Sequence, residues 1–171
     1  MATPSLLPTW RNFFTACWNI SAGHTFTADL NGGNESITII GACSSGRLLT
    51  SPVVLFNDFT DPSYLQAHAG ASIVVSAGLA GCDLLAFGAM QTPNETFTAG
   101  ASWAIPTNGQ NAGTGTLGIP AMVENIDNAA AGTYSGAFTS SGFSYSAGII
   151  IALAQAAAAS GGKMLSSMDV G

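Results

Sequence analysis

Short runs of β-branched and aromatic residues, each closed by a turn signal, constrain the fold of this 171-residue chain more than any other feature. The run Gly23–Leu30 alternates apolar and polar side chains, and Asn31–Asn34 then supplies residues that tolerate positive φ. Glu35–Ala42 alternates again, so the two runs together predict a hairpin. Runs bounded this closely by turn residues are typical of an all-β chain.

The same pattern continues to residue 153. We expect strands over Arg47–Phe56, Ala71–Ala77, Cys82–Met90, Thr96–Ile105, Ile119–Ile126, Gly132–Phe138 and Phe143–Leu153. Two of these, Ala71–Ala77 and Cys82–Met90, are apolar enough to be central strands. We expect loops at Asn57–Ser63 and Thr107–Gly118, and tight turns at Gly78–Gly81 and Thr139–Gly142. About nine or ten strands at this spacing predict a mainly β fold, an antiparallel two-sheet sandwich that is jelly-roll-like.

The N-terminal segment departs from the strand pattern. Its aromatic residues recur at the helical period, at Trp10, Phe13, Phe14 and Trp18. They predict a short helix or strand whose aromatic face closes one end of the domain's own core, or else an arm over residues 1–21 that docks into a neighbouring subunit. A chain of this length buries enough surface for one core, so residues 1–171 are expected to form a single domain.

Charged residues make up only 7% of the chain, and its three cations are Arg11, Arg47 and Lys163. An ordinary soluble domain carries about a quarter charged residues. No cationic cluster is available to neutralise phosphates or to face a membrane surface, so we expect neither nucleic acid nor membrane as a partner. Because 47% of the residues are hydrophobic, we expect copies of the chain or other subunits to cover its surface.

The first residues, MATPSLLPTWRNFF, lack a charged start followed by an apolar run. We therefore expect no signal peptide and synthesis in a cytoplasm. The three cysteines, Cys17, Cys43 and Cys82, are odd in number and lack CxxC spacing. This pattern favours small buried thiols over disulfides or a zinc site.

The second half of the chain carries a family resemblance. The segments DLLAFGAM, ETFTAGASWAIPT and AMVENIDNAAAGTYSGAFTSSGFSYSAGIIIALAQA resemble the strand order of small jelly-roll-like sandwich domains in bacteriophage virion proteins and some bacterial surface proteins. The resemblance covers about residues 82–156 and transfers no catalytic residue. It implies a virion structural protein, first of all a head decoration or cement subunit, whose partners are other virion proteins and copies of itself. A tail fibre or receptor-binding module, with a possible glycan ligand, and a free carbohydrate-binding module are the alternatives.

Few groups are available for catalysis. His24 and His68 are the only histidines that could serve as a base, and the stretch around Cys43 lacks the GxSxG elbow. A hydrolase with a Cys–His or Ser–His pair is the remaining enzymatic alternative. With so few titratable side chains to tune, we expect no enzymatic activity and no catalytic residue.

Cofactor and metal motifs are equally sparse. Gly113–Gly118 satisfies GxGxxG, but the sequence around it predicts a loop rather than the strand and helix that bind a dinucleotide. Asn57, Asp58 and Asp61 offer oxygen ligands for calcium, although such residues more often cap the amides of a solvated turn. We expect neither a cofactor nor a metal.

Three further residues could serve either structure or function. Glu124 and Asp127 are predicted to be turn and solubility residues rather than a catalytic carboxylate pair. Trp103 could stack on a sugar as an exposed platform, but a tryptophan in an alternating strand favours the core.

Overall fold

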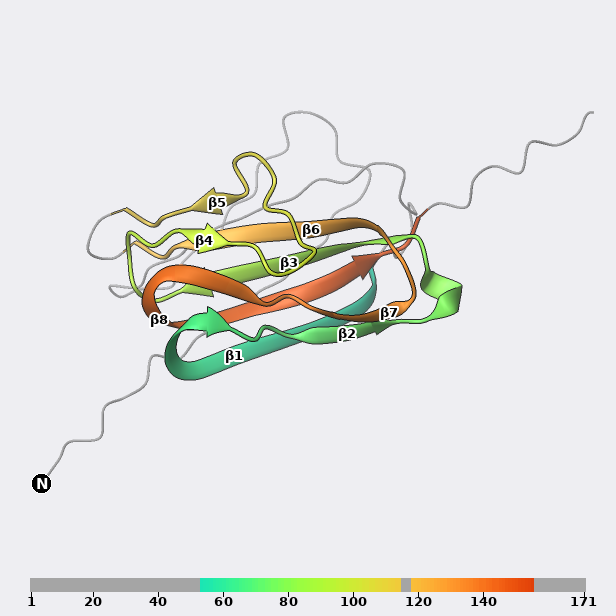
Figure 1. The fold of residues 1–171 in the computed structure, drawn as a ribbon, viewed down its shortest axis with the longest axis horizontal. Coiled ribbons are helices and arrows are strands. Elements are labelled where there is room, and N and C mark those ends of the chain that lie inside the picture. Colours follow the sequence, from blue (N-terminus) through green and yellow to red (C-terminus); the bar gives the residue numbers. More distant parts are fainter. Residues whose placement is uncertain (1–52, 115–117, 156–171) are drawn as a thin grey trace, which may run out of the picture.

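The structure is a computed structural model that describes residues 53–114 and 118–155. The predicted N-terminal hairpin and helix lie outside these residues. The described residues form eight strands and one short 3-10 helix, η1 (Ala77–Leu79). The strands are β1 (Val53–His68), β2 (Ser72–Val75), β3 (Cys82–Met90), β4 (Phe97–Thr98), β5 (Gln110–Asn111), β6 (Ala121–Ala129), β7 (Gly132–Ser135) and β8 (Phe138–Leu153) (Figure 1).

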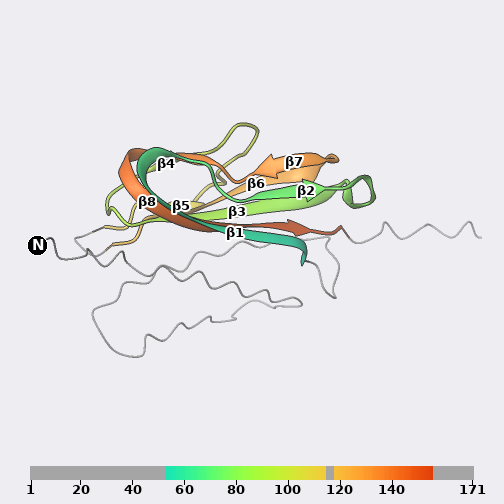
Figure 2. The same ribbon diagram turned by 90° about the horizontal axis from the view of Figure 1, so that it is seen from below.

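Every strand pairing is antiparallel. The larger sheet has the order β1-β8-β3-β6-β5, with β4 paired to β8, and β2 pairs with β7 in a smaller sheet. Figure 2 shows the β2–β7 sheet lying over one face of the larger sheet. The predicted mainly β, antiparallel two-sheet architecture is therefore confirmed.

The space between the two sheets holds the main core. Ile73 and Val75 of β2 meet Leu84 of β3 and Ile150 of β8 there, all of them buried. The alternation of the strands places these residues on facing surfaces. Fully burying an aliphatic side chain of this size stabilises a fold by about 1.5–3 kcal/mol.

A second cluster fills the end of the sandwich where β8 begins. Phe138 lies 6.4 Å from Phe59 and 5.5 Å from Phe97 between ring centroids, and both pairs meet edge to face. Met90 and Met122 complete this buried cluster. The cluster ties the first residues of β8 to strands β3, β4 and β6.

The predicted loop over Asn57–Ser63 is wrong, because β1 runs through it without interruption. Asn, Asp and Pro are typical turn residues and suggested a turn, but here all of them lie within strand β1. The register of β1 against β8 shifts between Asp61 and Leu65, and Pro62 lies in this irregular stretch. A proline is tolerated at such a bulge because the ladder there does not need its missing amide.

The predicted turn at Thr139–Gly142 is also wrong, since β8 is continuous over Phe138–Leu153. Thr139 pairs with Ala67 of β1 on one side and with Thr98 of β4 on the other. Strands on both sides of this polar stretch hold it extended, which its composition does not reveal.

The predicted strand Thr96–Ile105 shrinks to the two residues of β4. The chain turns after β4, where Ser102 has a φ of 69° and the amide of Trp103 donates to the carbonyl of Gly100. A positive φ at a residue other than glycine is incompatible with a regular strand.

The predicted central position of the Ala71–Ala77 strand is wrong too, because β2 belongs to the two-stranded sheet.

Candidate functional site

The four predicted interface residues, Trp10, Phe13, Phe14 and Trp18, lie outside the described residues, as do His24 and Cys43. So does part of the GxGxxG match, residues 115–117. The element that follows this match is strand β6, whereas a dinucleotide site requires a helix there.

An aromatic cluster, made of Tyr64, Phe143 and Tyr145, lies where β1 passes β8. The rings of Tyr64 and Phe143 stack with centroids 6.1 Å apart and planes 22° from parallel, and Tyr145 lies 5.3 Å from Tyr64. Tyr64 is 55% exposed and Phe143 is 53% exposed. The neighbouring Leu65 is also exposed. Tyr64 and Phe143, two of the large apolar side chains exposed in the described residues, thus lie together.

Hydrogen bonds fix the backbone beneath the aromatic cluster. The hydroxyl of Thr92 donates to the carbonyl of Phe143 over 3.1 Å. The buried Ser144 hydroxyl oxygen accepts from the amides of Gln91 and Thr92 at 3.1 and 3.0 Å. A surface held in this way loses little further conformational entropy when it binds a partner.

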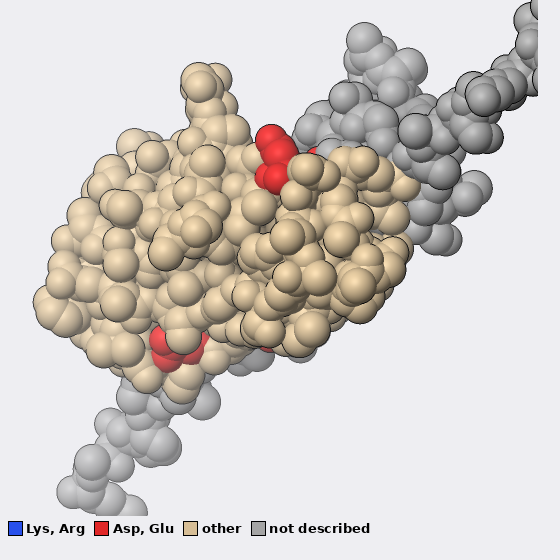
Figure 3. All heavy atoms as spheres, turned by 45° about the vertical axis from the view of Figure 1, so that its right-hand side comes forward, with Lys and Arg blue, Asp and Glu red and all other residues tan. Residues whose placement is uncertain are grey.

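The described residues around the aromatic cluster include no Lys or Arg. All three Lys and Arg residues of the chain lie outside residues 53–114 and 118–155, and Figure 3 shows one face with scattered carboxylates only. The described carboxylates that are not buried are Asp58, Asp61, Glu95 and Asp127. This part of the molecule therefore presents a sparse negative charge.

His68 is buried between two serines. Its Nε2 lies 3.2 Å from the Ser140 hydroxyl, and its Nδ1 lies 2.8 Å from the Ser146 hydroxyl. The Ser140 hydroxyl donates to the carbonyl of Gly142, so it must accept from Nε2–H, and Ser146 then donates to Nδ1. Burial lowers the pKa of His68 and favours the neutral ring, while the negative charge of Asp61 opposes that shift. His68 is 2% exposed and both its nitrogens are engaged, so this arrangement supports the fold rather than attack on a substrate.

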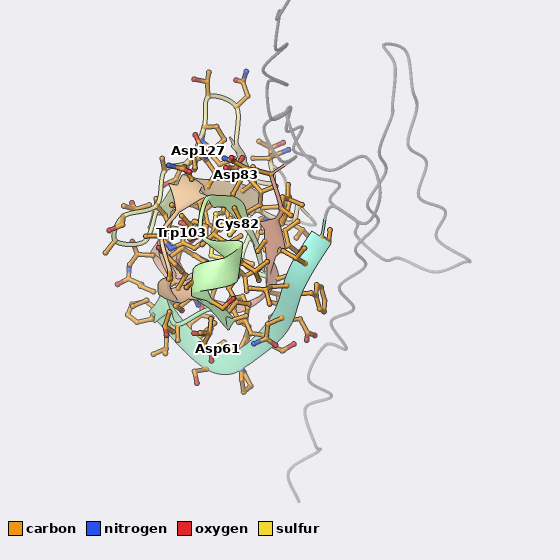
Figure 4. All side chains as sticks on the ribbon, turned by 90° about the vertical axis from the view of Figure 1, so that its right-hand side faces the viewer. Asp61, Cys82, Asp83, Trp103 and Asp127 are labelled. Atoms are coloured by element: carbon orange, nitrogen blue, oxygen red, sulfur yellow. The ribbon has the colours of Figure 1, made fainter. Side chains whose placement is uncertain are left out.

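The proposed calcium ligands lie in β1 rather than in a loop. The side-chain oxygen of Asn57 accepts from the amide of Asp58, and one carboxylate oxygen of Asp61 accepts from the amide of Ser63. Within the described ranges no three His, Cys, Asp or Glu side chains group as metal ligands. Figure 4 shows Asp61 on the curved part of β1, apart from Asp83 and Asp127. The capping role that the sequence favoured fits this geometry.

Glu124 is not the turn residue that the sequence predicted. It lies in β6 opposite Ala86 of β3, and its side chain is fully buried. The sequence prediction failed because a glutamate among Val, Asn and Ile looks solvated, and no pattern in β6 marks its face as the inner one. Asp127, also predicted in a turn, lies in β6 as well, where it is exposed and accepts from the Asn125 side chain.

The Glu124 carboxyl group has one polar contact. Its Oε2 accepts from the amide of Gly100 over 3.0 Å, whereas its Oε1 has no hydrogen-bond partner among the described residues. Burial raises the pKa of Glu124 to about 7, and the hydrogen bond from Gly100 offsets part of that rise. The sequence pattern did not predict that Glu124 is buried.

Two other predictions can be placed. Cys82 is buried, as expected for a structural thiol. Trp103 packs partly buried against the main core, as the core interpretation expected, although it lies in a loop rather than a strand.

No family model matches the sequence, and neither the curated proteins nor the solved structures gave a match. Within residues 53–114 and 118–155, no helix is long and apolar enough to cross a membrane.

Proposed function

We propose that this chain is a non-enzymatic structural subunit that works through protein–protein contacts. The observation that carries the proposal is the aromatic cluster, which lies exposed among described residues that include no Lys or Arg. Aromatic side chains dominate the energetics of protein interfaces, and charged residues are depleted at interface centres. Tyr64 and Phe143 supply the first property, and the sparse charge of the described surface supplies the second.

The more specific assignment is a virion structural protein of the head decoration or cement kind, located in the virion and bound to copies of itself and to other virion proteins. It rests on the sequence resemblance over about residues 82–156 and on the poverty of charge. A subunit that is permanently packed in a shell does not need the charged surface that keeps free monomers apart.

A carbohydrate-binding module or a receptor-binding tail module is the second candidate, and the near-parallel exposed rings of Tyr64 and Phe143 favour it. Planar aromatic faces give a sugar ring an apolar platform, and tyrosine adds a polar group at its edge. This candidate predicts saturable binding of a neutral glycan to a monomer, which the structural role does not require.

Association in solution tests the proposal. We expect the double variant Tyr64→Ser/Phe143→Ser to weaken self-association of the full chain at least about tenfold, because it removes two interface anchors. Val74→Ser is the matched control, since Val74 is 64% exposed on β2 of the smaller sheet. Sedimentation equilibrium of the three proteins gives the comparison.

Two results would reject the structural role. One is equal association of the double variant and the wild type. The other is a wild-type monomer that binds a neutral glycan on an array and loses this binding in the double variant, which would favour the second candidate.

A further inference from the structure

Glu124 faces the space between the two sheets, and the part of the chain that the structure describes supplies it with no counter-charge. In its row across the larger sheet, Glu124 pairs with Ala86, and Ala86 pairs with Ile150 of β8. Above this row lies Gly136, where an added Cβ would stand 2.6 Å from the Ala86 side chain and 3.9 Å from Glu124 Oε1. The carboxyl group is thus enclosed by the small residues around it.

The 99–105 loop, made of residues 99–105, is hydrogen-bonded to β6 at two places. The amide of Gly100 donates to Glu124 Oε2 over 3.0 Å. Farther along, Ala104 and Asn125 exchange both backbone hydrogen bonds, at 3.1 and 2.8 Å. The first of these attachments has an ionisable acceptor, whereas the second does not.

The loop fits closely where it meets Glu124. A Cβ at Gly100 would lie 2.0 Å from the carbonyl oxygen of Ala137, so only glycine brings the backbone this near. Trp103, three residues after Gly100 in the same loop, packs on the main core. Movement of Gly100 would therefore also shift Trp103, which packs on the core.

Among residues 53–114 and 118–155, no neighbouring cation compensates an ionised Glu124. The groups that face it, Ala86 on β3, Gly100 on the loop and Gly136 after β7, cannot titrate. Other titratable groups of the flanking strands have their own bonds: Tyr134 of β7 donates to the carbonyl of Ala130, Asp127 of β6 accepts from Asn125, and the buried Asp83 of β3 accepts from the amide of Asn128. Ionisation would leave a buried charge with a single donor and one unsatisfied oxygen, which is far costlier than a neutral carboxylic acid.

We propose that Glu124 and the 99–105 loop form a proton-operated latch. The neutral acid lets the loop lie closed on β6, and loss of the proton drives the carboxylate toward water and releases Gly100. The burial that raises the pKa of Glu124 to about 7 places this change near neutral pH. The latch is independent of the proposed structural role, because it involves none of the residues of the aromatic cluster.

Amide hydrogen exchange of the full chain tests the latch. Protection factors, corrected for the intrinsic pH dependence of exchange, are measured for the amides of Gly100 and Ala104 at about pH 5 and about pH 8. We expect the wild type to lose at least about tenfold in protection across this range. Glu124→Gln removes the ionisable group, so the protection of Gly100 and Ala104 in this variant should not change with pH. Asp127→Asn, on the same strand but exposed, should behave as the wild type.

A direct titration keeps the test decisive if Glu124→Gln does not fold. The carboxyl carbon of Glu124 and the amide of Gly100 in the wild type should then titrate together near neutral pH in NMR spectra. The latch is wrong if Glu124→Gln loses protection as the wild type does, if wild-type protection is constant, or if the Glu124 carboxyl titrates at its ordinary value.

Discussion

A buried carboxyl group without a counter-charge makes folding depend on pH, and Glu124 is such a group as far as the described residues go. Its pKa is raised from 4.5 to about 7 in the folded chain, so the folded state holds its proton more tightly than the unfolded state does. Its contribution to stability is complete below the unfolded pKa and is lost as pH rises toward the folded one.

We therefore predict that the free energy of unfolding falls by about 3 kcal/mol between about pH 4.5 and pH 7 through Glu124 alone. Urea unfolding of the wild type and Glu124→Gln at a series of pH values measures this quantity. The difference between the two proteins should change across this range, and a constant difference would contradict the prediction.

His68 depends on pH in the opposite direction. Burial lowers its pKa below 6.5 in the folded chain, so its contribution is complete above the unfolded pKa and is lost as pH falls. The neutral ring needs the Ser146 hydroxyl as a donor to Nδ1.

Ser146→Ala should lower the free energy of unfolding by about 1–3 kcal/mol, because it leaves the buried Nδ1 without a partner. Ser76→Ala is the control, since Ser76 is exposed and its side chain makes no capping bond to η1. Urea unfolding at about pH 8, where the ring is neutral, compares the variants. Equal losses in the two variants would show that the Ser146 hydroxyl does not support the ring.

At the scale of elements, β3 and β8 pack closely because glycines face each other in their register. Gly88 of β3 pairs with Gly148 of β8. An added Cβ at Gly148 would lie 2.1 Å from the carbonyl oxygen of Phe87, and one at Gly88 would lie 2.6 Å from the ring of Phe138. The Gly88 position leaves the room that the Phe138 ring fills.

We predict that Gly148→Ala destabilises the fold more than Gly88→Ala, because backbone cannot yield as a ring can, with losses of about 1–3 kcal/mol or more. Gly78→Ala should be close to neutral, since nothing lies within 4 Å of its added Cβ. Thermal unfolding of the three variants ranks them. The account of this packing fails if Gly78→Ala is as damaging as Gly148→Ala.

The sequence predicted elements best where one local signal decided them. The apolar run Cys82–Met90, closed by turn residues at its start, is β3 with both bounds correct. It failed where tertiary pairing overrode composition: Pro62 lies inside β1, and the polar start of β8 is held between β1 and β4. At the residue scale it placed Cys82 in the interior but missed Glu124, because which face of β6 turns inward depends on the smaller sheet.

At the scale of the whole molecule, the proposed structural role depends on the low fraction of charged residues. The chain carries a net charge of −6 with three cations, none of them in the described ranges. In the self-association proposed above, two copies would repel weakly through their net charge and would attract through apolar contacts rather than through ion pairs. Added salt at 0.1 M screens the repulsion between charges more than about 10 Å apart and leaves the apolar contacts intact.

The mass of the purified full chain in solution, measured across concentration at low and at high salt, tests the central claim most directly. The account predicts oligomers that grow with concentration and that salt strengthens, because screening removes only repulsion. A chain that stays monomeric at about millimolar concentration, or whose association salt abolishes, would contradict the claim that apolar contacts between subunits are its function.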